Sequence, residues 1–275
     1  MSVLTLPQSS KSVVVTCFAV QSVALYAVAN HQHRSLWLSV VAFFAGGFLT
    51  DLISGLFHFS FDYVWPPRTP IMGPISVEFQ QHHEEPTLDP SAVVSNFTRG
   101  AYGALPIAIV TWIAVEMSAD SAASFLGTAT LMATSLWMLG FHQIHSYAHM
   151  GSRLSPEEFN RAVIEINQLP SRQQKEEFAK VFESLGIPKF IRLLQRCRLF
   201  LRPEVHWQHH ISFESDFSSV NGWSDPLMNL LYRPVARRKK ATRVSSSNDL
   251  TIDPMTRPTG RKMEELNETT RISLS

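Results

Sequence analysis

Long apolar runs place the strongest constraint on how this chain can fold. They cover residues 12–29, 36–61, 101–115 and 122–141. A helix needs about 20 apolar residues to cross a bilayer, and the run at 101–115 reaches that length if its ends extend a little. Because lipid offers no hydrogen-bond partners to the backbone, a spanning segment must be a helix or part of a closed barrel. We therefore expect an all-α integral membrane protein, a helical bundle with about four transmembrane helices.

The first apolar run has a second interpretation, a secretory signal peptide. Lys11 alone forms the basic region before it, and the sequence from Tyr26 to Asn30 is only a fair cleavage site, so we expect a retained helix. Residues 1–11 then form an N-terminal segment and residues 12–235 the membrane domain. Residues 236–275 form a basic and polar tail, which we expect to be disordered because large apolar residues become sparse in it.

The charge distribution excludes one class of partner and predicts an orientation. The net charge is +1 and Lys and Arg form no stripe with interleaved aromatics, so nucleic acid is not an expected partner. The connection between the last two apolar runs holds Glu116 and Asp120 but neither Lys nor Arg, whereas the C-terminal segment carries the basic run 237–240. By the positive-inside rule, residues 63–100 and 142–275 face the cytosol.

Residues 187–201 form a basic, amphipathic segment. It mixes Phe, Ile and Leu with Lys189, Arg192, Arg196 and Arg198. This composition predicts a helix that lies at the bilayer surface. The alternative is an ordinary helix packed in a soluble core.

Eight of the eleven histidines fall into four groups at the edges of the apolar runs. They are His58, His82, His83, His145, His149, His206, His209 and His210. Imidazole is costly to place near lipid unless another interaction offsets the cost, and coordination of a metal ion does so. Eight imidazoles are too many for one ion and suit two. We therefore expect a histidine-rich cytosolic cap that binds two metal ions.

The spacing of some of these residues suits a helix. His145 and His149 lie four residues apart, so one helical turn can offer both nitrogens to one ion. The segment between them lacks the Glu of the zinc metalloprotease motif, which argues against a zinc hydrolase. Asp51, His58 and Asp62 share one face of a helix. We expect both carboxylates to orient ligating imidazoles by hydrogen bonds to their far nitrogens.

The ligand type narrows the choice of metal. Sets of imidazoles suit zinc, copper, iron or nickel. Iron that activates O2 can remove hydrogen from an unactivated C–H bond, which acid–base chemistry cannot do. The adjoining apolar helices can receive a lipid chain and exclude water from the reaction. The pattern therefore favours O2-dependent iron chemistry on a lipid.

The order of the motifs along residues 47–231 resembles that of the Kua/CarF lipid desaturase family. The motifs are Asp51-x3-Gly55-x2-His58-x3-Asp62, Pro70-x2-Gly73, His82-His83-x2-Pro86, Asn96, Gln143-x-His145-x3-His149, Leu194-Gln195, His206-x2-His209-His210 and Asn221-Gly222-Trp223. The family includes plasmanylethanolamine desaturases and the plastid enzyme that introduces a trans double bond into the palmitate of phosphatidylglycerol. The resemblance implies an integral membrane di-iron enzyme whose iron ligands are the eight grouped histidines.

The resemblance also implies partners and supporting residues. O2 would be the co-substrate, and electrons would come from cytochrome b5 in endomembranes or ferredoxin in plastids. Asn96, Gln143 and Asn221 become candidates for orienting the ligands or a lipid headgroup. Phe59, Ser146 and residues 155–185 depart from the family pattern, the last as a probable insertion. These departures leave the histidines intact and affect the region where a lipid would bind.

We therefore expect an oxidoreductase that introduces a vinyl-ether double bond into a plasmanyl ether phospholipid, in plasmalogen synthesis. The nearest alternative is an acyl-lipid desaturase or hydroxylase with the same site. Further alternatives are a membrane zinc hydrolase and a non-enzyme with structural or haem-binding histidines, although haem needs one or two histidines and leaves most of these unexplained. The expected location is the endoplasmic reticulum or another endomembrane, with plastid and bacterial inner membranes left open.

Overall fold

The fold is helical throughout the described part of the chain. A computed structural model describes residues 9–70, 72–84, 88–150, 161–162, 165–166, 168–170, 173–174, 176–177 and 186–249. Contacts divide the chain into two compact units, residues 1–236 and 237–275. The expected all-α class is confirmed for the described residues.

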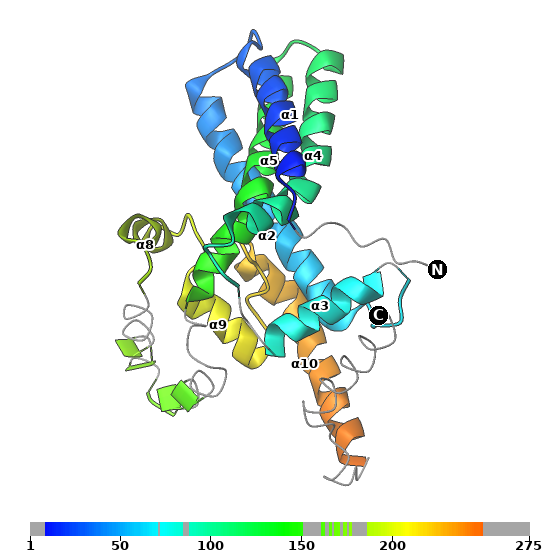
Figure 1. The fold of residues 1–275 in the computed structure, drawn as a ribbon, viewed down its shortest axis with the longest axis vertical. Helices are drawn as coiled ribbons and strands as arrows, with labels where there is room; N and C mark the ends of the chain where they lie inside the picture. The colour runs from blue at the N-terminus through cyan, green and yellow to red at the C-terminus, as the bar shows by residue number, and fades with distance from the viewer. Residues whose placement is uncertain are drawn as a thin grey trace, which may run out of the picture. The chain divides into compact units, whose positions relative to one another are not determined.

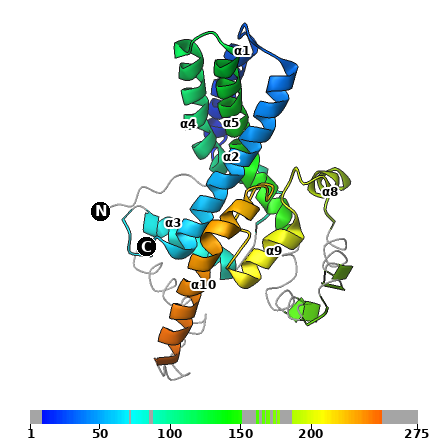
Figure 2. The ribbon, with the colours of Figure 1, turned by 180° about the vertical axis from the view of Figure 1, so that it is seen from behind.

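Four helices of the first unit are long and apolar enough to cross a membrane. They are α1 (Lys11–Ala29), α2 (Leu36–Tyr63), α4 (Val93–Met117) and α5 (Ala122–Ala148). They lie side by side as a bundle (Figures 1 and 2). The expectation of about four spanning helices is confirmed, and α4 gains the extra length that its short apolar run required.

Polar side chains mark the helix starts and link the bundle. The hydroxyl oxygens of Ser10 and Ser121 accept hydrogen bonds from the first turns of α1 and α5. Inside the bundle, the Gln21 amide nitrogen of α1 donates to the Ser135 hydroxyl of α5 (3.0 Å), and that hydroxyl donates to the Ala104 carbonyl of α4 (2.8 Å). These two hydrogen bonds connect the first helix to α5 and, through Ser135, to α4.

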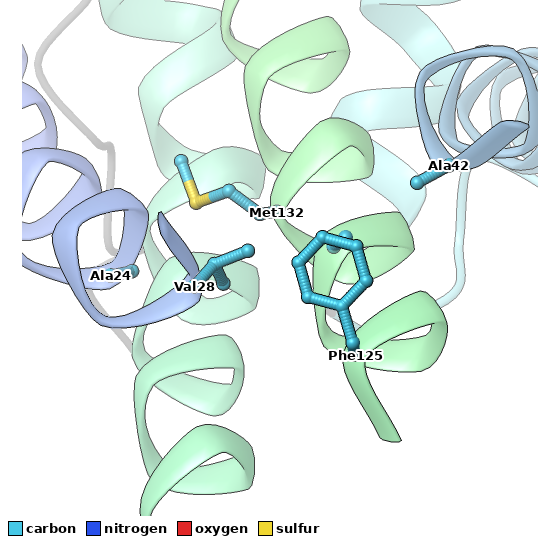
Figure 3. Close-up of a cluster of buried hydrophobic side chains, with 6 residues drawn as sticks. Ala24, Val28, Ala42, Phe125 and Met132 are labelled. Carbon is cyan, nitrogen blue, oxygen red and sulfur yellow. The ribbon is translucent and has the colours of Figure 1, made fainter. Parts of the chain in front are cut away.

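Small and aromatic side chains fill the bundle at the end where α1 finishes. Ala24 and Val28 of α1 meet Ala42 of α2 and Phe125 and Met132 of α5 in one buried cluster (Figure 3). All eight grouped histidines lie on helices or helix ends beyond the other end of the bundle. The bundle therefore separates this buried apolar cluster from the end that bears the grouped histidines.

Helices α2 and α5 continue past the bundle into a cap. The cap also holds α3 (Met72–Glu84), α9 (Pro203–Ser212) and the first turns of α10 (Asp225–Asp249), gathered around the lower ends of α2 and α5 (Figures 1 and 2). Phe59, Phe217 and Met228 form part of its core. A short helix, α8 (Lys189–Arg196), lies beside the junction of bundle and cap.

Two expectations concern the later parts of the chain. The proposed insertion at residues 155–185 falls mostly outside the described residues. Helix α10 continues to Asp249, past residue 236 where we expected a disordered tail to begin. The Ala, Arg and Lys residues at 236–241 are good helix formers, which favours the continuation of the helix. Residues 250–275 lie outside the described residues.

Candidate metal centre

All eight predicted histidines converge in the cap. His58 lies in α2, and His145 and His149 lie in the last turn and at the C-cap of α5. The remaining five belong to α3 (His82 and His83) and α9 (His206, His209 and His210). Their rings form two neighbouring sets, each drawn from at least three helices.

The first set, here called the His145 group, consists of His82, His145, His149, His206 and His210. The Nε2 atoms of His145, His149 and His206 lie 2.7–3.0 Å from one another. The Nε2 atom of His210 lies 3.0 Å from that of His206. A ligand nitrogen of His82 lies within 4.8 Å of those of His145, His149 and His206.

Hydrogen bonds among the rings cannot account for this triangle of nitrogens. A neutral imidazole Nε2 carries either one hydrogen or one lone pair, so three such atoms in mutual contact cannot all be satisfied by one another. Two nitrogens that each lie about 2.1 Å from a common ion, at a right angle, are roughly 3 Å apart. The spacing therefore fits lone pairs directed at a shared metal ion.

The second set, the His58 group, consists of His58, His83, His209 and Asp62. The three Nε2 atoms are 3.0–3.3 Å apart, which repeats the triangle of the first set. Asp62 Oδ2 lies 3.6 Å from His209 Nε2 and 3.8 Å from His58 Nε2. This set can hold a second ion with three nitrogens and a carboxylate oxygen.

The two carboxylate oxygens of Asp62 lie near different nitrogens of this group. Its Oδ1 lies 3.5 Å from His83 Nδ1, the far nitrogen of a converging ring, as expected for a supporting carboxylate. Its Oδ2 is close to the point where the three Nε2 atoms converge. Asp62 is therefore placed to act as a ligand itself as well as to orient His83.

Two serines orient the rings of the His58 group, and sequence reasoning missed both. His209 Nδ1 donates to the Ser215 carbonyl oxygen (2.8 Å), which leaves the lone pair of His209 on Nε2. His58 Nδ1 lies 3.3 Å from the Ser219 hydroxyl. Both serines belong to the loop 213–224, which follows the α9 histidines directly. The polar residues of that loop, adjoining a histidine motif, were the available signal.

Asp51 supports the site through this loop rather than through an imidazole, which corrects the sequence expectation. Its Oδ1 accepts hydrogen bonds from the backbone N–H groups of Val220, Asn221 and Gly222 (2.9–3.2 Å). Its Oδ2 accepts from the N–H and the hydroxyl of Ser224 (both 2.8 Å). A fully buried carboxylate therefore fixes the loop that carries the orienting serines.

The three predicted amides also act on the backbone around the site. Asn96 donates to Gln143 (3.1 Å) and to the Asp89 carbonyl (3.0 Å), while Gln143 donates to the Pro90 carbonyl (2.9 Å). These bonds attach the segment after α3 to α4 and α5. Asn221 Oδ1 accepts from the N–H of Trp223 within the loop (3.0 Å). The amides thus position the segments around the histidines.

The remaining three histidines, His31, His33 and His142, belong to neither set. His31 and His33 lie beside Asp120, between α1 and α2, at the other end of the bundle. The ring of His142 packs against Phe141, with 4.0 Å between ring centroids. Among the described residues, none of the three belongs to a group that could hold a metal.

Burial keeps the converging histidines of the cap neutral. It lowers the pKa of His82 and of His209 to about 4, and that of His83 to about 2. The same cause lowers the pKa of His206 and His210. Only the neutral ring can ligate a metal, so the site is poised for metal at neutral pH.

One comparison with known proteins gives a match. The model of the lipid desaturase domain family matches residues 47–180, which include the grouped histidines of α2, α3 and α5 and end before α9. Neither the curated proteins nor the solved structures give a match to this chain. The family match, the four apolar helices and the two histidine groups together support a membrane lipid desaturase and hence an oxidoreductase.

Proposed function

We propose that this protein is a di-iron lipid desaturase that introduces a vinyl-ether double bond into a plasmanyl ether phospholipid. The observation that carries the proposal is the pair of buried nitrogen triangles, in the His145 group and the His58 group. Two separate sets of convergent lone pairs call for two metal ions rather than one. The family match supports lipid as the substrate.

The residues present fit a pair of iron ions. Imidazole and carboxylate are ligands that iron accepts, and the described ligand atoms of the two sets come from histidines and Asp62 without a cysteine. Bound iron would supply an oxidation in which O2 accepts two hydrogens from the substrate and two electrons and two protons from outside, and leaves as two waters. The eight histidines and Asp62 would hold the ions.

The protein's own residues then do three things for the reaction. The imidazoles stay neutral through burial and keep their lone pairs on the convergent nitrogens. Ser215 and Ser219 fix the ring orientations of His209 and His58, and Asp51 fixes the loop that bears them. The apolar surface of α2 and α5 beside the site can accept an alkyl chain and exclude water.

The proposal extends to partners and location. An external electron donor, cytochrome b5 or ferredoxin, would deliver the two electrons. The site would face the cytosol from the endoplasmic reticulum or another endomembrane, as the basic residues of the C-terminal segment indicate. The proposed ligands of the two ions are the eight histidines and Asp62, with Asp51 in support.

The test is lipid analysis in cells that lack their own ether-lipid desaturase. The parent chain, a His83→Ala variant and a His142→Ala control are expressed to equal levels with a reductant partner, and vinyl-ether lipids are measured by mass spectrometry. We expect vinyl ethers from the parent and the His142→Ala control, and a loss of at least a hundredfold in His83→Ala.

Other outcomes would revise the proposal at different points. A new unsaturated or hydroxylated acyl chain without vinyl ethers would keep the metal site and change the substrate to that of an acyl-lipid desaturase or hydroxylase. An unchanged lipid profile, together with zinc rather than iron in the purified protein, would refute the desaturase proposal and favour a hydrolase.

A further inference from the structure

Helix α8 carries apolar side chains on a face that the described protein does not cover. Phe190 is 67% exposed and Leu193 is 55% exposed. Cys197, at the C-cap, continues the same face one turn later and is also exposed. Side chains at i, i+3 and i+7 share one face of a helix, so these three form an apolar stripe.

Basic side chains flank this stripe. Lys189, Arg196 and Arg198 are exposed, and the helix itself contains no acidic residue. An apolar stripe bordered by cations is the composition of a helix that lies in a membrane interface, with its apolar side in the acyl region and its cations among headgroups.

Helix α8 lies at the level where a bilayer surface would cross the bundle. In two views α8 is seen end-on beside the lower end of the bundle, so it runs across the direction of the spanning helices (Figures 1 and 2). Phe141 of α5 packs both against the cluster that contains Cys17 of α1 and against the cluster that contains Leu201. The segment after α8 is therefore level with the first turns of α1, where that spanning helix starts at the exposed Lys11.

Contacts on the other side hold α8 at this level. The Leu201 N–H donates to the Val220 carbonyl (2.7 Å), and the Trp223 indole donates to the Arg198 carbonyl (2.6 Å). The Trp223 ring lies against Phe44 of α2, with 5.6 Å between centroids. The exposed stripe is thus fixed with respect to the bundle instead of being free to fold inward.

We propose that α8 is an interfacial helix that binds anionic phospholipid and thereby holds the cap at the membrane surface. Its occupant is the bilayer in which the bundle is embedded, because the exposed stripe lies beside the lower end of the bundle and its cations complement anionic headgroups. Arg192 lies 4.0 Å from Glu204 of α9, and α9 begins shortly after α8 and carries three grouped histidines. Binding of α8 to the membrane interface therefore sets the depth of the metal site relative to the lipid surface.

Cys197 allows a direct test on the full-length protein in proteoliposomes. The chain's other cysteine, Cys17, is fully buried, so an environment-sensitive fluorophore can be attached at Cys197. Quenching by acyl-brominated lipid is compared with quenching by aqueous acrylamide, in phosphatidylcholine alone and with phosphatidylglycerol added. We expect strong bromolipid quenching and weak acrylamide quenching, with the bromolipid component rising when phosphatidylglycerol is present.

Paired variants separate charge from the apolar stripe. A Lys189→Gln/Arg196→Gln variant should lose on the order of tenfold in its preference for anionic lipid, whereas Arg68→Gln/Arg233→Gln, with two other exposed cations removed, should keep it. A Phe190→Ser/Leu193→Ser variant should move the label into water. Strong acrylamide quenching in both bilayers would overturn the proposal, as would protection that appears only when an acidic redox protein is added.

Discussion

At the scale of single residues, Asp51 has the widest influence on the candidate site. Its carboxylate accepts five hydrogen bonds from the loop that carries Ser215 and Ser219. An Asp51→Asn variant keeps the shape but replaces one acceptor oxygen by a donor that faces the N–H of Ser224 or the N–H groups of Val220 to Gly222. We expect a loss of about 2–4 kcal/mol in stability and a weaker hold on the metal of the His58 group.

The measurement combines the thermal midpoint in detergent with the number of metal ions per chain. Asp225→Asn is the matched control, because Asp225 is buried beside the same loop and accepts a hydrogen bond from the Ser218 N–H. Burial, with Asp51 and Asp216 nearby, raises the pKa of Asp225 to about 7, so it is already partly neutral and its amide should cost less. Equal losses in the two variants would argue against a special role for Asp51.

The buried imidazoles make the metal-free protein sensitive to acid. The pKa of His82 and His209 is about 4 in the folded protein, against an ordinary value of about 6.5 in the unfolded chain. Between these values the unfolded chain binds more protons, so stability falls as pH falls through that window. Each histidine can lower the free energy of unfolding by at most about 1.4 kcal/mol for each pH unit within this window. Thermal midpoints of metal-free protein should drop steeply from pH 7 to pH 5, and a flat profile would contradict the burial of these rings.

At the scale of helices, the packing of α4 on α5 depends on Gly100. A Cβ atom at this position would lie 2.1 Å from the Leu139 carbonyl oxygen, so the two backbones touch. Gly100→Ala should push the helices apart and strain the Asn96–Gln143 bond that spans them. We expect a loss of about 1–3 kcal/mol, with a parallel loss of activity.

Gly127 of α5 supplies the control for this prediction. A Cβ atom there would meet nothing within 4 Å, and Ala is the better helix former by about 1 kcal/mol. Gly127→Ala should therefore keep or raise the thermal midpoint, while Gly100→Ala lowers it. If both variants behaved alike, the close approach at Gly100 would not limit the packing of the bundle.

The spanning helices were predictable from sequence because each one contains a continuous run of apolar residues. The runs at 12–29, 36–61 and 122–141 became α1, α2 and α5 nearly unchanged at their starts. The histidines were predictable as a set because their chemistry near lipid has few explanations. The division into two groups, and the roles of Ser215, Ser219 and Asp51, were not predictable, because they depend on how a loop at 213–224 meets α2 from far along the chain.

At the scale of the whole molecule, the metal centre joins helices that lie far apart in the sequence. The eight histidines come from α2, α3, α5 and α9, and each proposed ion draws on three of these. Ions held this way bind the folded protein and not the unfolded chain, so they add stability that grows with the logarithm of the free ion concentration relative to the dissociation constant. Without them, the clustered lone pairs repel one another inside the cap.

Removal of metal should therefore loosen the cap as one unit. We expect a chelator to lower the thermal midpoint of the parent protein by about 10 °C or more, since a gain of several kcal/mol is lost, and ferrous iron to restore it under anaerobic conditions. His83→Ala, which already lacks one ligand of the His58 group, should show a smaller shift, and His142→Ala the full shift. A parent midpoint that stays constant while its metal is removed would mean that the ions do not join these helices, and the proposed ligand sets would then have to be abandoned.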